Sequence, residues 1–586
     1  MMPFISKKSR TWKHSIIIFV LACERLSLAH LRCHNIIDSG SFKRTNIDMS
    51  DAELALPQTK PSEKPETAPS EIPTDASSGG GGGGGPTNSF KAMFFALCLS
   101  LVVGLSVGLG VGLSDKNDGG DAVCPSADPS STTATVAAPF LDDPLPPTET
   151  ASRYTPAEFD TLEAIYVAWP RYDYVTSLPQ VRTVVLEMLL GLCSCQLDTT
   201  MTAQQKEDCT DIIVQAPADI LDDANTTIFS TPGLEDCPIR FQTSERDDMW
   251  IRDIGPVFTK SCDGANADGT TTANYDERVV VDFQFDFWSA VGLGSPDLNH
   301  LEATLDQRIY ASDFPNLTVT RTNLIGEGGN REFNGQGVLL MNRDVERYRN
   351  EKKAWSIERS EEEYKRIFGV DKIVWVDGVP NNDFIAEFPT RGKIDDVETY
   401  LFNWGTGGHI DELARFVTPG TIVISQISDA EVEHDTTGVV ANDQAILRSI
   451  KEQLEQATDA NGQKFKIIEA PAAPLFINEM TADDELWYWF EPLNVFQDTL
   501  AAGKKIHTIG ATSYMNFVTT NKVVLIPKYF MEGDEVFGLE EIQTADQEFK
   551  NIMTSVYPDR KIVAINPLPV NQGGGGMHCI SAHQNK

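Results

Sequence analysis

Four short segments of this sequence contain the side-chain types that can do chemistry, and the first is acidic and aromatic. Residues 247–256 read Asp-Asp-Met-Trp-Ile-Arg-Asp-Ile-Gly-Pro. A carboxylate such as Asp253 and an aromatic ring such as Trp250 suit a planar cation, because the carboxylate accepts paired hydrogen bonds and the ring face attracts positive charge. The alternative is structural, with Arg252 paired to an acid across the turn.

Two glycine-rich turns supply candidate acid–base groups. The turn Gly-Glu-Gly-Gly-Asn contains Glu327 and ends at Asn330, and its glycines allow close backbone approach. The turn Gly-Thr-Gly-Gly-His-Ile-Asp places His409 and Asp411 two positions apart, on one face of an extended segment. This spacing suits a proton-transferring imidazole beside a carboxylate, or two metal ligands with Glu327 as a third. A structural histidine at the end of a strand is the remaining interpretation.

The fourth segment carries a thiol near the C-terminus. A run of glycines that includes Gly574 and Gly575 precedes Cys579. Backbone N–H groups exposed in such a run can stabilise negative charge, and a cysteine is a nucleophile only as the thiolate. The apolar run at 562–569 predicts a strand that feeds this loop, which favours an ordered thiol over a flexible tail with an incidental cysteine.

Composition and charge restrict the partners of such a site. The chain has 586 residues, of which 85 are acidic and 48 basic, so its net charge is −37 at pH 7. This field repels phosphate backbones, which excludes nucleic acid as a partner. Hydrophobic residues make up 41% of the chain and aromatic residues 9%. The chain can therefore bury a large core, and disorder describes only part of it.

The N-terminal part of the chain differs in composition from the rest. Residues 1–91 predict a disordered polar tail that contains a glycine run, with Met49 as an alternative natural start. Residues 92–113 carry no charge over 22 positions, which is long enough for one transmembrane helix; a buried core helix is the alternative. Residues 114–151 predict a Pro/Ser/Thr-rich stalk, and 152–586 an ordered domain.

The predicted membrane helix and the cysteines together predict a location. Glycines four positions apart in the helix would allow close approach of a second copy, and hence a homodimer. Six cysteines cluster between 124 and 262 while Cys579 stands apart, which indicates disulfides plus one reactive thiol. Glycosylation acceptor patterns begin at Asn225 and Asn316. We therefore expect a single-pass membrane protein whose ordered domain is lumenal or extracellular, with an organelle as the alternative destination.

Strand and helix patterns alternate along the ordered domain. Runs rich in Val and Ile and bounded by Gly, Asp or Pro predict strands at 278–287, 372–376, 421–427, 522–527 and 561–565. Residues 181–192 and 443–457 have helical periodicity instead, the second with Ile446, Leu447, Ile450 and Leu454 on one face. The fold class is α/β. These patterns alone leave a doubly wound sheet and a propeller-like arrangement both open.

The four segments together resemble the agmatine deiminase and bacterial-type peptidylarginine deiminase family, within the guanidine-modifying (pentein) superfamily. The segment ending at Asp253 is similar to the family's substrate-binding W-x-R-D motif, the segment with His409 and Asp411 to its G-H-x-D motif, and the glycine run before Cys579 to its nucleophile loop. The segment Pro-Ala-Glu-Phe at the start of the domain and the segment Ser-Tyr-Met-Asn-Phe match further family segments. The resemblance covers about residues 152–586, which it identifies as a deiminase catalytic domain.

This resemblance implies a five-bladed α/β propeller of pseudo-symmetric units with a central active site. It makes Cys579 the nucleophile and His409 the general acid and base. Asp253 and Asp411 would hold a guanidinium, and Glu327 would orient His409. The implied substrate-binding residues are Trp250, Asn330, Asn516, Gly574 and Gly575. Neither a metal nor an organic cofactor is implied.

The implied reaction is hydrolysis of a guanidino group through a covalent thiouronium on Cys579. His409 would protonate the departing ammonia and then activate water. We expect Cys579 to need a lowered pKa, part of which a bound cation can supply. The expected substrate is agmatine, which would give N-carbamoylputrescine and ammonia in putrescine synthesis.

Two alternatives to agmatine hydrolysis stay open at this point. One is conversion of peptidyl arginine to citrulline, and the other is a non-catalytic guanidinium-binding ectodomain. The turn after Glu327 departs from the family pattern, since residues 330–335 read Asn-Arg-Glu-Phe-Asn-Gly, and this puts the substrate in doubt. An arginine near the entrance would favour peptidyl arginine, for which Arg331 and Arg415 are candidates.

Overall fold

A computed structural model of the protein describes most of the ordered domain. The described residues are 153–171, 180–244, 249–255, 257–261, 278–286, 288, 317–351, 355–384, 390–403, 405–481 and 506–586. The tail predicted at 1–91, the membrane helix predicted at 92–113 and the stalk predicted at 114–151 all lie outside these residues.

The prediction of a single-pass membrane protein with a lumenal or extracellular domain is wrong on this structure. None of the described helices is both long and apolar enough to cross a membrane. The longest, α13 (Val440–Gln456) and α16 (Glu540–Val556), have 17 residues each and carry charged side chains, whereas a span needs about 20 predominantly apolar residues. Residues 92–113, on which the prediction and the homodimer both depended, are outside the described part of the chain.

Five sheets of the described chain repeat one pattern of strand pairing. In each, a first strand runs antiparallel to a second, and the second runs parallel to a third. Given as first, second and third strand, one sheet consists of β21 (Ser581–Asn585), β2 (Leu162–Ala168) and β3 (Asp211–Pro217), and the next of β5 (Val257–Ser261), β6 (Arg278–Gln284) and β7 (Thr318–Ile325). The third sheet consists of β8 (Glu332–Phe333), β9 (Val338–Asn342) and β10 (Lys372–Val376), and the fourth of β13 (Ala414–Thr418), β14 (Thr421–Gln426) and β15 (Lys466–Pro471). The fifth sheet consists of β18 (Val518–Thr519), β19 (Val523–Pro527) and β20 (Lys561–Ile565). Two sheets have a fourth strand, since β1 (Arg153–Tyr154) pairs with β5 and β4 (Ile239–Ser244) pairs with β3.

In four of the five repeated sheets, described helices make the crossover between the parallel strands, because two parallel neighbours cannot be joined by a tight turn; most of the segment between β6 and β7 lies outside the described residues. The helices that follow the second strand of a sheet are α4 (Val181–Cys193), α10 (Arg343–Asn350), α11 (Ile357–Phe368), α12 (Asp429–His434), α13 and α16, and α5 (Ala203–Lys206) follows α4. A further helix, α6 (Leu221–Ser230), joins β3 to β4. The repeated strand–strand–helix–strand order confirms the α/β fold class.

Local sequence signals explain where several helices begin and end. Ser356 caps α11 at its N-terminus, and Gly369 ends the helix with a φ of 65°, a left-handed conformation that glycine adopts readily. A capping box formed by Ser428 and Glu431 starts α12. In α13 the predicted face is confirmed, since Leu447, Ile450 and Leu454 are buried.

A sixth sheet of the described chain lies outside the repeat. Its strands, in spatial order, are β11 (Thr390–Ile394), β12 (Val397–Phe402), β17 (Ile506–Ile509) and β16 (Ile477–Met480). The chain leaves β12 directly for the turn that carries His409, and it leaves β17 for the segment that carries Asn516.

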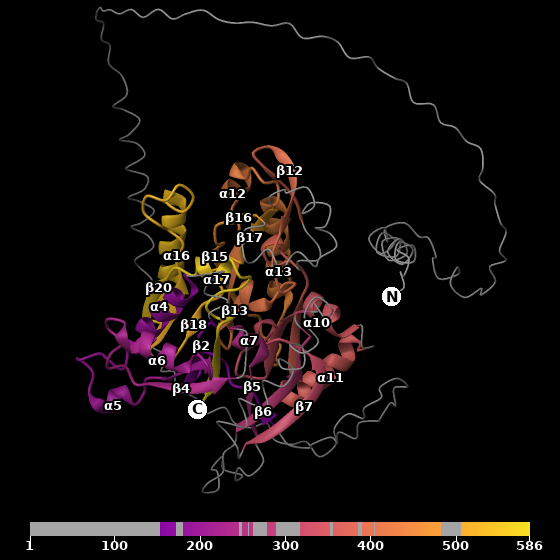
Figure 1. Ribbon diagram of the computed structural model, residues 1–586. Helices are drawn as coiled ribbons and strands as arrows, with labels where there is room; N and C mark the ends of the chain where they lie inside the picture. Colours follow the sequence, from indigo (N-terminus) through magenta and orange to yellow (C-terminus); the bar gives the residue numbers. More distant parts are fainter. Residues whose placement is uncertain are drawn as a thin grey trace, which may run out of the picture. The chain divides into compact units, whose positions relative to one another are not determined.

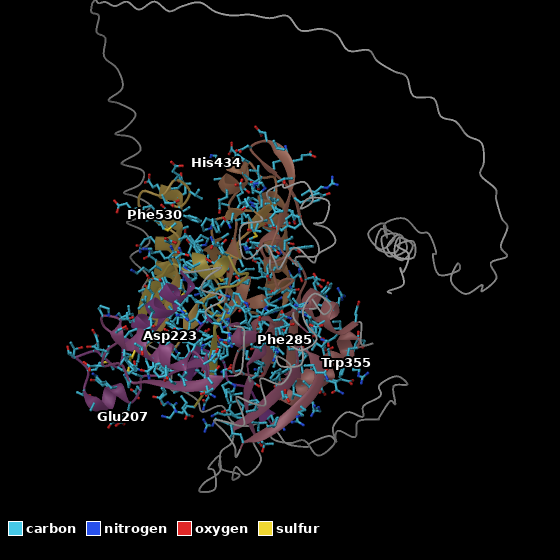
Figure 2. The ribbon with its side chains drawn as sticks, in the orientation of Figure 1. Glu207, Asp223, Phe285, Trp355, His434 and Phe530 are labelled. Atoms are coloured by element: carbon cyan, nitrogen blue, oxygen red, sulfur yellow. A yellow bond between two sulfur atoms is a disulfide. The ribbon has the colours of Figure 1, made fainter. Side chains whose placement is uncertain are left out.

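Two disulfides confirm the expectation for the cysteine cluster. Cys193 pairs with Cys237, and Cys195 pairs with Cys209. Both cross-links lie in the part of the molecule where Figure 2 labels Glu207 and Asp223. Among the described residues, the remaining thiol is that of Cys579, which is buried.

The end of the chain completes the sheet that the beginning of the ordered domain starts. The C-terminal strand β21 pairs antiparallel with β2, with Ala582 opposite Tyr166, and the C-terminus lies beside these early elements in Figure 1. Cys579 is two residues before β21. The residue that could act as nucleophile therefore depends on contact between the two ends of the ordered domain.

Candidate active site

The predicted site residues lie in turns that immediately precede the first strands of the five repeated sheets. Asp253 is on the short helix α7 (Ile251–Ile254) before β5, and Glu327 directly precedes the 3-10 turn η2 (Gly328–Asn330) before β8. His409 directly precedes the 3-10 turn η5 (Ile410–Glu412), which contains Asp411, before β13. Asn516 and Cys579 each lie two residues before β18 and β21. Each sheet thus contributes at least one group.

Backbone hydrogen bonds to a buried carboxylate fix the turn that carries His409. Asp383, on the 3-10 turn η4 (Asn381–Asp383), accepts from the backbone N–H groups of Thr406 at 2.6 Å, Gly408 at 2.9 Å and His409 at 2.8 Å. Gly408 has a φ of 101°, which a residue with a side chain rarely adopts. The turn geometry therefore requires glycine at position 408.

The ring of His409 is completely buried between two carboxylates. Its Nδ1 lies 3.7 Å from Asp253 Oδ1, and its Nε2 lies 3.6 Å from Glu327 Oε2. Burial alone would lower the pKa of His409, but these carboxylates raise it to about 9. The ring is therefore positively charged at neutral pH and can donate a proton.

Glu327 is held in place by a buried arginine on α10. Arg349 Nε donates to Glu327 Oε1 at 2.7 Å, and Arg349 Nη2 donates to the carbonyl of Thr406 at 2.6 Å. Burial would raise the pKa of Glu327, but the Arg349 charge lowers it to about 2. Glu327 is thus a negative charge beside His409 at neutral pH, and its orienting role stays a prediction.

The thiol of Cys579 lies next to amide and carboxyl groups. Its Sγ is 3.3 Å from Asn516 Nδ2, 3.8 Å from Glu412 Oε1 and 4.0 Å from Asp411 Oδ2. Burial and the charges of Asp411 and Glu412 hold the pKa of Cys579 well above its ordinary value. In the protein by itself the pKa of the thiol is thus raised, so the lowered pKa that the reaction needs stays a prediction for the complex with a bound cation.

Asp253 and Asp411 present one oxygen each to the same point. Asp253 Oδ1 accepts from the backbone N–H of Gly329 at 3.0 Å, and Oδ2 accepts from the indole N–H of Trp288 at 2.9 Å. A Cβ on Gly329 would lie 2.4 Å from His409 Nδ1, 3.1 Å from Asp411 Oδ1 and 3.2 Å from Asp253 Oδ1. Only glycine fits where these three side chains converge.

Several buried polar atoms of this site have no hydrogen-bond partner in the described part of the chain. They are His409 Nδ1 and Nε2, Asp411 Oδ1, Glu327 Oε2 and Glu412 Oε2. Buried polar groups in proteins are nearly always hydrogen-bonded, so such a group of unpartnered atoms indicates the place of a polar ligand. A planar cation with N–H donors on all sides matches carboxylate acceptors of this kind.

The other predicted residues divide into two groups. Trp250 and Gly575 are at the site, since a Cβ on Gly575 would lie 2.6 Å from Trp250 Cζ3 and 3.1 Å from Cys579 Sγ. Gly574 supports the same loop with a φ of 100°. The side chain of Asn330 instead bonds the main chain of Asn342, donating at 3.1 Å and accepting at 3.0 Å, so the structure gives it a structural contact and not one to the thiol.

Three neighbours of the site were not predicted. Glu412 and His578 are adjacent in sequence to the predicted Asp411 and Cys579, and this adjacency was the only signal for them. Arg349 had no signal, because its pairing with Glu327 spans 22 positions.

Neither arginine considered for the entrance lies at an exposed position. Arg415 is 1% exposed and pairs with Glu158 and Glu332. Arg331 is 5% exposed, with its guanidinium 3.7 Å from the ring centre of Phe283. Both side chains are therefore buried and make their contacts inside the protein.

Residues 154–402 and 398–584 match the family model of the Porphyromonas-type peptidyl-arginine deiminases. The agmatine deiminase of Medicago truncatula is 24% identical over 350 residues, which cover 59% of this chain and 78% of that protein. Among solved structures, the agmatine deiminase of Enterococcus faecalis superposes with a TM-score of 0.52 at 21% identity, covering 74% of this chain and 96% of its own. This last likeness is one of fold.

The sequence matches and the geometry agree on the class of chemistry. The matched relatives are deiminases, and the non-catalytic ectodomain considered from the sequence is thereby excluded. Because the family model spans nearly all of the ordered domain, the chain belongs to the Porphyromonas-type peptidyl-arginine deiminase family and is a hydrolytic deiminase of guanidino groups.

Proposed function

We propose that this enzyme hydrolyses agmatine to N-carbamoylputrescine and ammonia. The observation that carries the proposal is that His409 Nδ1, Asp411 Oδ1 and Asp253 Oδ1 lie 2.4, 3.1 and 3.2 Å from the position that a Cβ on Gly329 would take. Asp411 Oδ1 has no hydrogen-bond partner in the described chain, and Asp411 Oδ2 lies 4.0 Å from Cys579 Sγ. The proposed guanidinium site is beside these two carboxylates. A guanidinium there would donate to both carboxylates, with the ring of Trp250 beside it.

In the proposed first step the bound cation activates the thiol. Burial and negatively charged neighbours raise the pKa of Cys579. A guanidinium placed beside Sγ offsets those charges and favours the thiolate. The thiolate then attacks the central carbon of the guanidinium, and one C–N bond breaks as His409 gives its proton to the departing ammonia.

In the proposed second step water releases the product. The covalent intermediate is a thiouronium, in which the former guanidinium carbon is bonded to Sγ. His409, now neutral, takes a proton from water, and the resulting hydroxide adds to that carbon. The C–S bond then breaks, which returns the thiolate and leaves a protonated ureido group, whose proton passes to the released ammonia. The sum is guanidinium plus water giving urea derivative plus ammonium.

Agmatine is the preferred substrate for two reasons. The similar protein of Medicago truncatula is named an agmatine deiminase. In addition, Arg331 and Arg415 are buried in other contacts, so neither is placed to bind the carboxylate or backbone of an arginine residue. The family description names peptidyl arginine, which remains the alternative that the experiment must test.

We also propose that the five repeated sheets close into a five-bladed propeller. The support is that each first strand follows a turn with a site residue, and that the last strand β21 pairs with β2 of the first sheet. In such an arrangement the five turns meet on one axis.

The test is formation of ureido product by the full-length protein with agmatine, free arginine and an arginine-containing peptide offered separately. We expect turnover of agmatine and none in the Cys579→Ala variant. Alkylation of Cys579 under non-reducing conditions should be slowed by agmatine. Turnover of the peptide alone would overturn the choice of agmatine, and full activity in Cys579→Ala would overturn the mechanism.

A further inference from the structure

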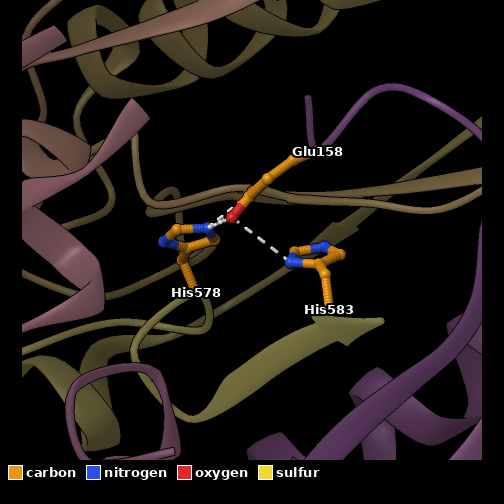
Figure 3. A group of neighbouring side chains, drawn as sticks. All are labelled: Glu158, His578 and His583. Carbon is orange, nitrogen blue, oxygen red and sulfur yellow. Dashed lines mark hydrogen bonds and ion pairs between the residues drawn. The ribbon is translucent and has the colours of Figure 1, made fainter. Parts of the chain in front are cut away.

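A cluster of charged and imidazole groups includes His578, the residue that directly precedes Cys579. Glu158 stands between His578 and His583, as Figure 3 shows. Nδ1 of His578 lies 2.7 Å from Asp411 Oδ2. The cluster therefore reaches the candidate guanidinium site through one hydrogen bond.

This cluster is the arrangement closest to a metal site in the described residues, yet its ligand atoms are already occupied. Glu158 accepts from Arg252 Nη1 and from Arg415 Nη2, each at 2.5 Å. His583 Nε2 is 3.0 Å from the carbonyl of Thr519, and its Nδ1 is 2.7 Å from Arg252 Nη2. Because an arginine only donates hydrogen bonds, Nδ1 of His583 accepts from Arg252, and Nε2 donates to the carbonyl of Thr519. The lone pair that could bind a metal ion is therefore already in a hydrogen bond. Two guanidinium groups beside the carboxylate also repel a cation.

Both ring nitrogens of His578 face carboxylate oxygens. Nδ1 is 2.7 Å from Asp411 Oδ2, and Nε2 is 2.8 Å from Glu158 Oε2. Burial would raise the pKa of both acids, but Arg252 lowers that of Glu158, and the bond from His578 lowers that of Asp411. The bond between Nδ1 and Asp411 Oδ2 is the one that bears on the candidate site, with Nδ1 as its donor.

The two carboxylate oxygens of Asp411 have different surroundings. Oδ2 is held by His578, while Oδ1 has no partner in the described chain and lies with His409 Nδ1 and Asp253 Oδ1 around Gly329. We propose that His578 is a positioning residue, which turns Asp411 so that Oδ1 is available to the guanidinium. Glu158 holds the ring from the opposite side. This inference rests on the proposed function.

Two substitutions separate the two bonds of His578. In His578→Asn the side-chain amide can occupy the position of Nδ1 and still donate to Asp411. In His578→Gln the longer side chain reaches toward the position of Nε2 and Glu158, so Asp411 loses its 2.7 Å bond to His578 and keeps only the 3.4 Å bond from Asn516 Nδ2 on Oδ2. His583→Gln is the matched control, because it keeps a donor for Thr519 and does not touch Asp411.

The measurements are kcat and KM for agmatine with the full-length protein, and protection of Cys579 from iodoacetamide by agmatine. We expect His578→Gln to lower kcat/KM roughly 10- to 100-fold, mainly through KM, and to weaken protection equally, as expected for loss of a hydrogen bond to a charged group. His578→Asn should stay within about fivefold of wild type, and His583→Gln within about twofold.

Several outcomes would overturn the inference. These are equal losses in His578→Asn and His578→Gln, a loss in kcat alone, or failure of both variants to fold, which would assign His578 to stability. A wild-type protein that turns over none of the guanidines would refute the proposed function instead. Protection of Cys579 by agmatine would then still report guanidinium binding, and the two His578 variants would still be compared.

Discussion

Replacing Glu327 with glutamine tests whether the surrounding carboxylates keep His409 protonated. Gln has the shape of Glu but no charge. In the wild type, Glu327 Oε2 is 3.6 Å from His409 Nε2, and Asp253 Oδ1 is 3.7 Å from Nδ1. The substitution therefore removes one of two nearly equidistant negative charges while burial of the ring stays the same.

The expected size follows from the pKa of His409. It is about 9, against an ordinary value of about 6.5, and burial acts in the opposite direction. If the two carboxylates raise the pKa of His409 equally, loss of one removes half of their combined effect. This is more than half of the net increase, because burial offsets part of the combined effect, and the pKa of His409 falls to about 7. Two unit charges 3.6 Å apart interact by about 5 kcal/mol at an effective dielectric constant of 20, which is more than enough for this shift.

The assay is kcat/KM for agmatine between pH 6 and pH 10. Because the pKa of His409 is raised, the proton-donating form is present below about pH 9 and is lost as pH rises through that value. In Glu327→Gln the same loss should occur around pH 7. At pH 8 the variant should then be roughly tenfold less active through protonation alone, with a much smaller difference at pH 6.

A control is needed because the substitution also leaves Arg349 buried without its partner, which costs about 3–5 kcal/mol of stability. The pH at which kcat/KM falls on the alkaline side, here called the alkaline limb, does not depend on how much of the protein is folded. This pH is therefore the decisive quantity. Arg349→Lys retains the positive charge beside Glu327 and should leave the limb near pH 9. An unchanged limb in Glu327→Gln would refute the assignment of His409 as the proton donor whose pKa these carboxylates set.

Three further predictions follow from contacts of the site and of α13. Burial and the neighbouring acids raise the pKa of Glu412 as well as that of Cys579, so Glu412→Gln should speed alkylation of Cys579 severalfold only at an alkaline pH at which Glu412 is ionised; slower alkylation there would make Glu412 the base of the thiol. Gly575→Ala should lower kcat/KM roughly 100-fold without global unfolding, because its Cβ would lie 2.6 Å from Trp250 and 3.1 Å from Cys579 Sγ. Asp443 has a pKa raised by burial to about 7, so its folded form binds a proton more tightly, and stability is lost as pH rises through 7. Asp443→Asn should therefore raise the melting temperature at pH 8 and leave it nearly unchanged below pH 4, and equal shifts at both values would contradict this.

Strand and helix positions were largely predictable because they depend on local patterns. The predicted strands 372–376 and 561–565 are β10 and β20, and the predicted helix 181–192 is α4, extended by one residue. The strand predicted over 278–287 ends at Gln284 as β6. The membrane prediction failed because it was drawn from one apolar segment outside the described chain, while the described helices follow the amphipathic pattern of a packed α/β domain.

The site was predictable where a residue and its glycines occur together in the sequence. Cys579, His409 and Asp411 are each preceded by glycines that the turn geometry requires, and the structure brings them together. The groups that set their charges were not predictable in this way. Arg349 and Glu158 reach the site from distant parts of the chain, and a pairing over such separations leaves no periodic signal.

The pairing of β21 with β2 also determines when the enzyme can first become active. Cys579 is made by the ribosome after every other site segment, and it acquires its neighbours only when β21 has emerged and inserted beside β2. A nascent or truncated chain that stops before Cys579 has four of the five site turns but no nucleophile. Such a chain would be inert toward guanidines, so activity itself reports that β21 has been made and has paired with β2.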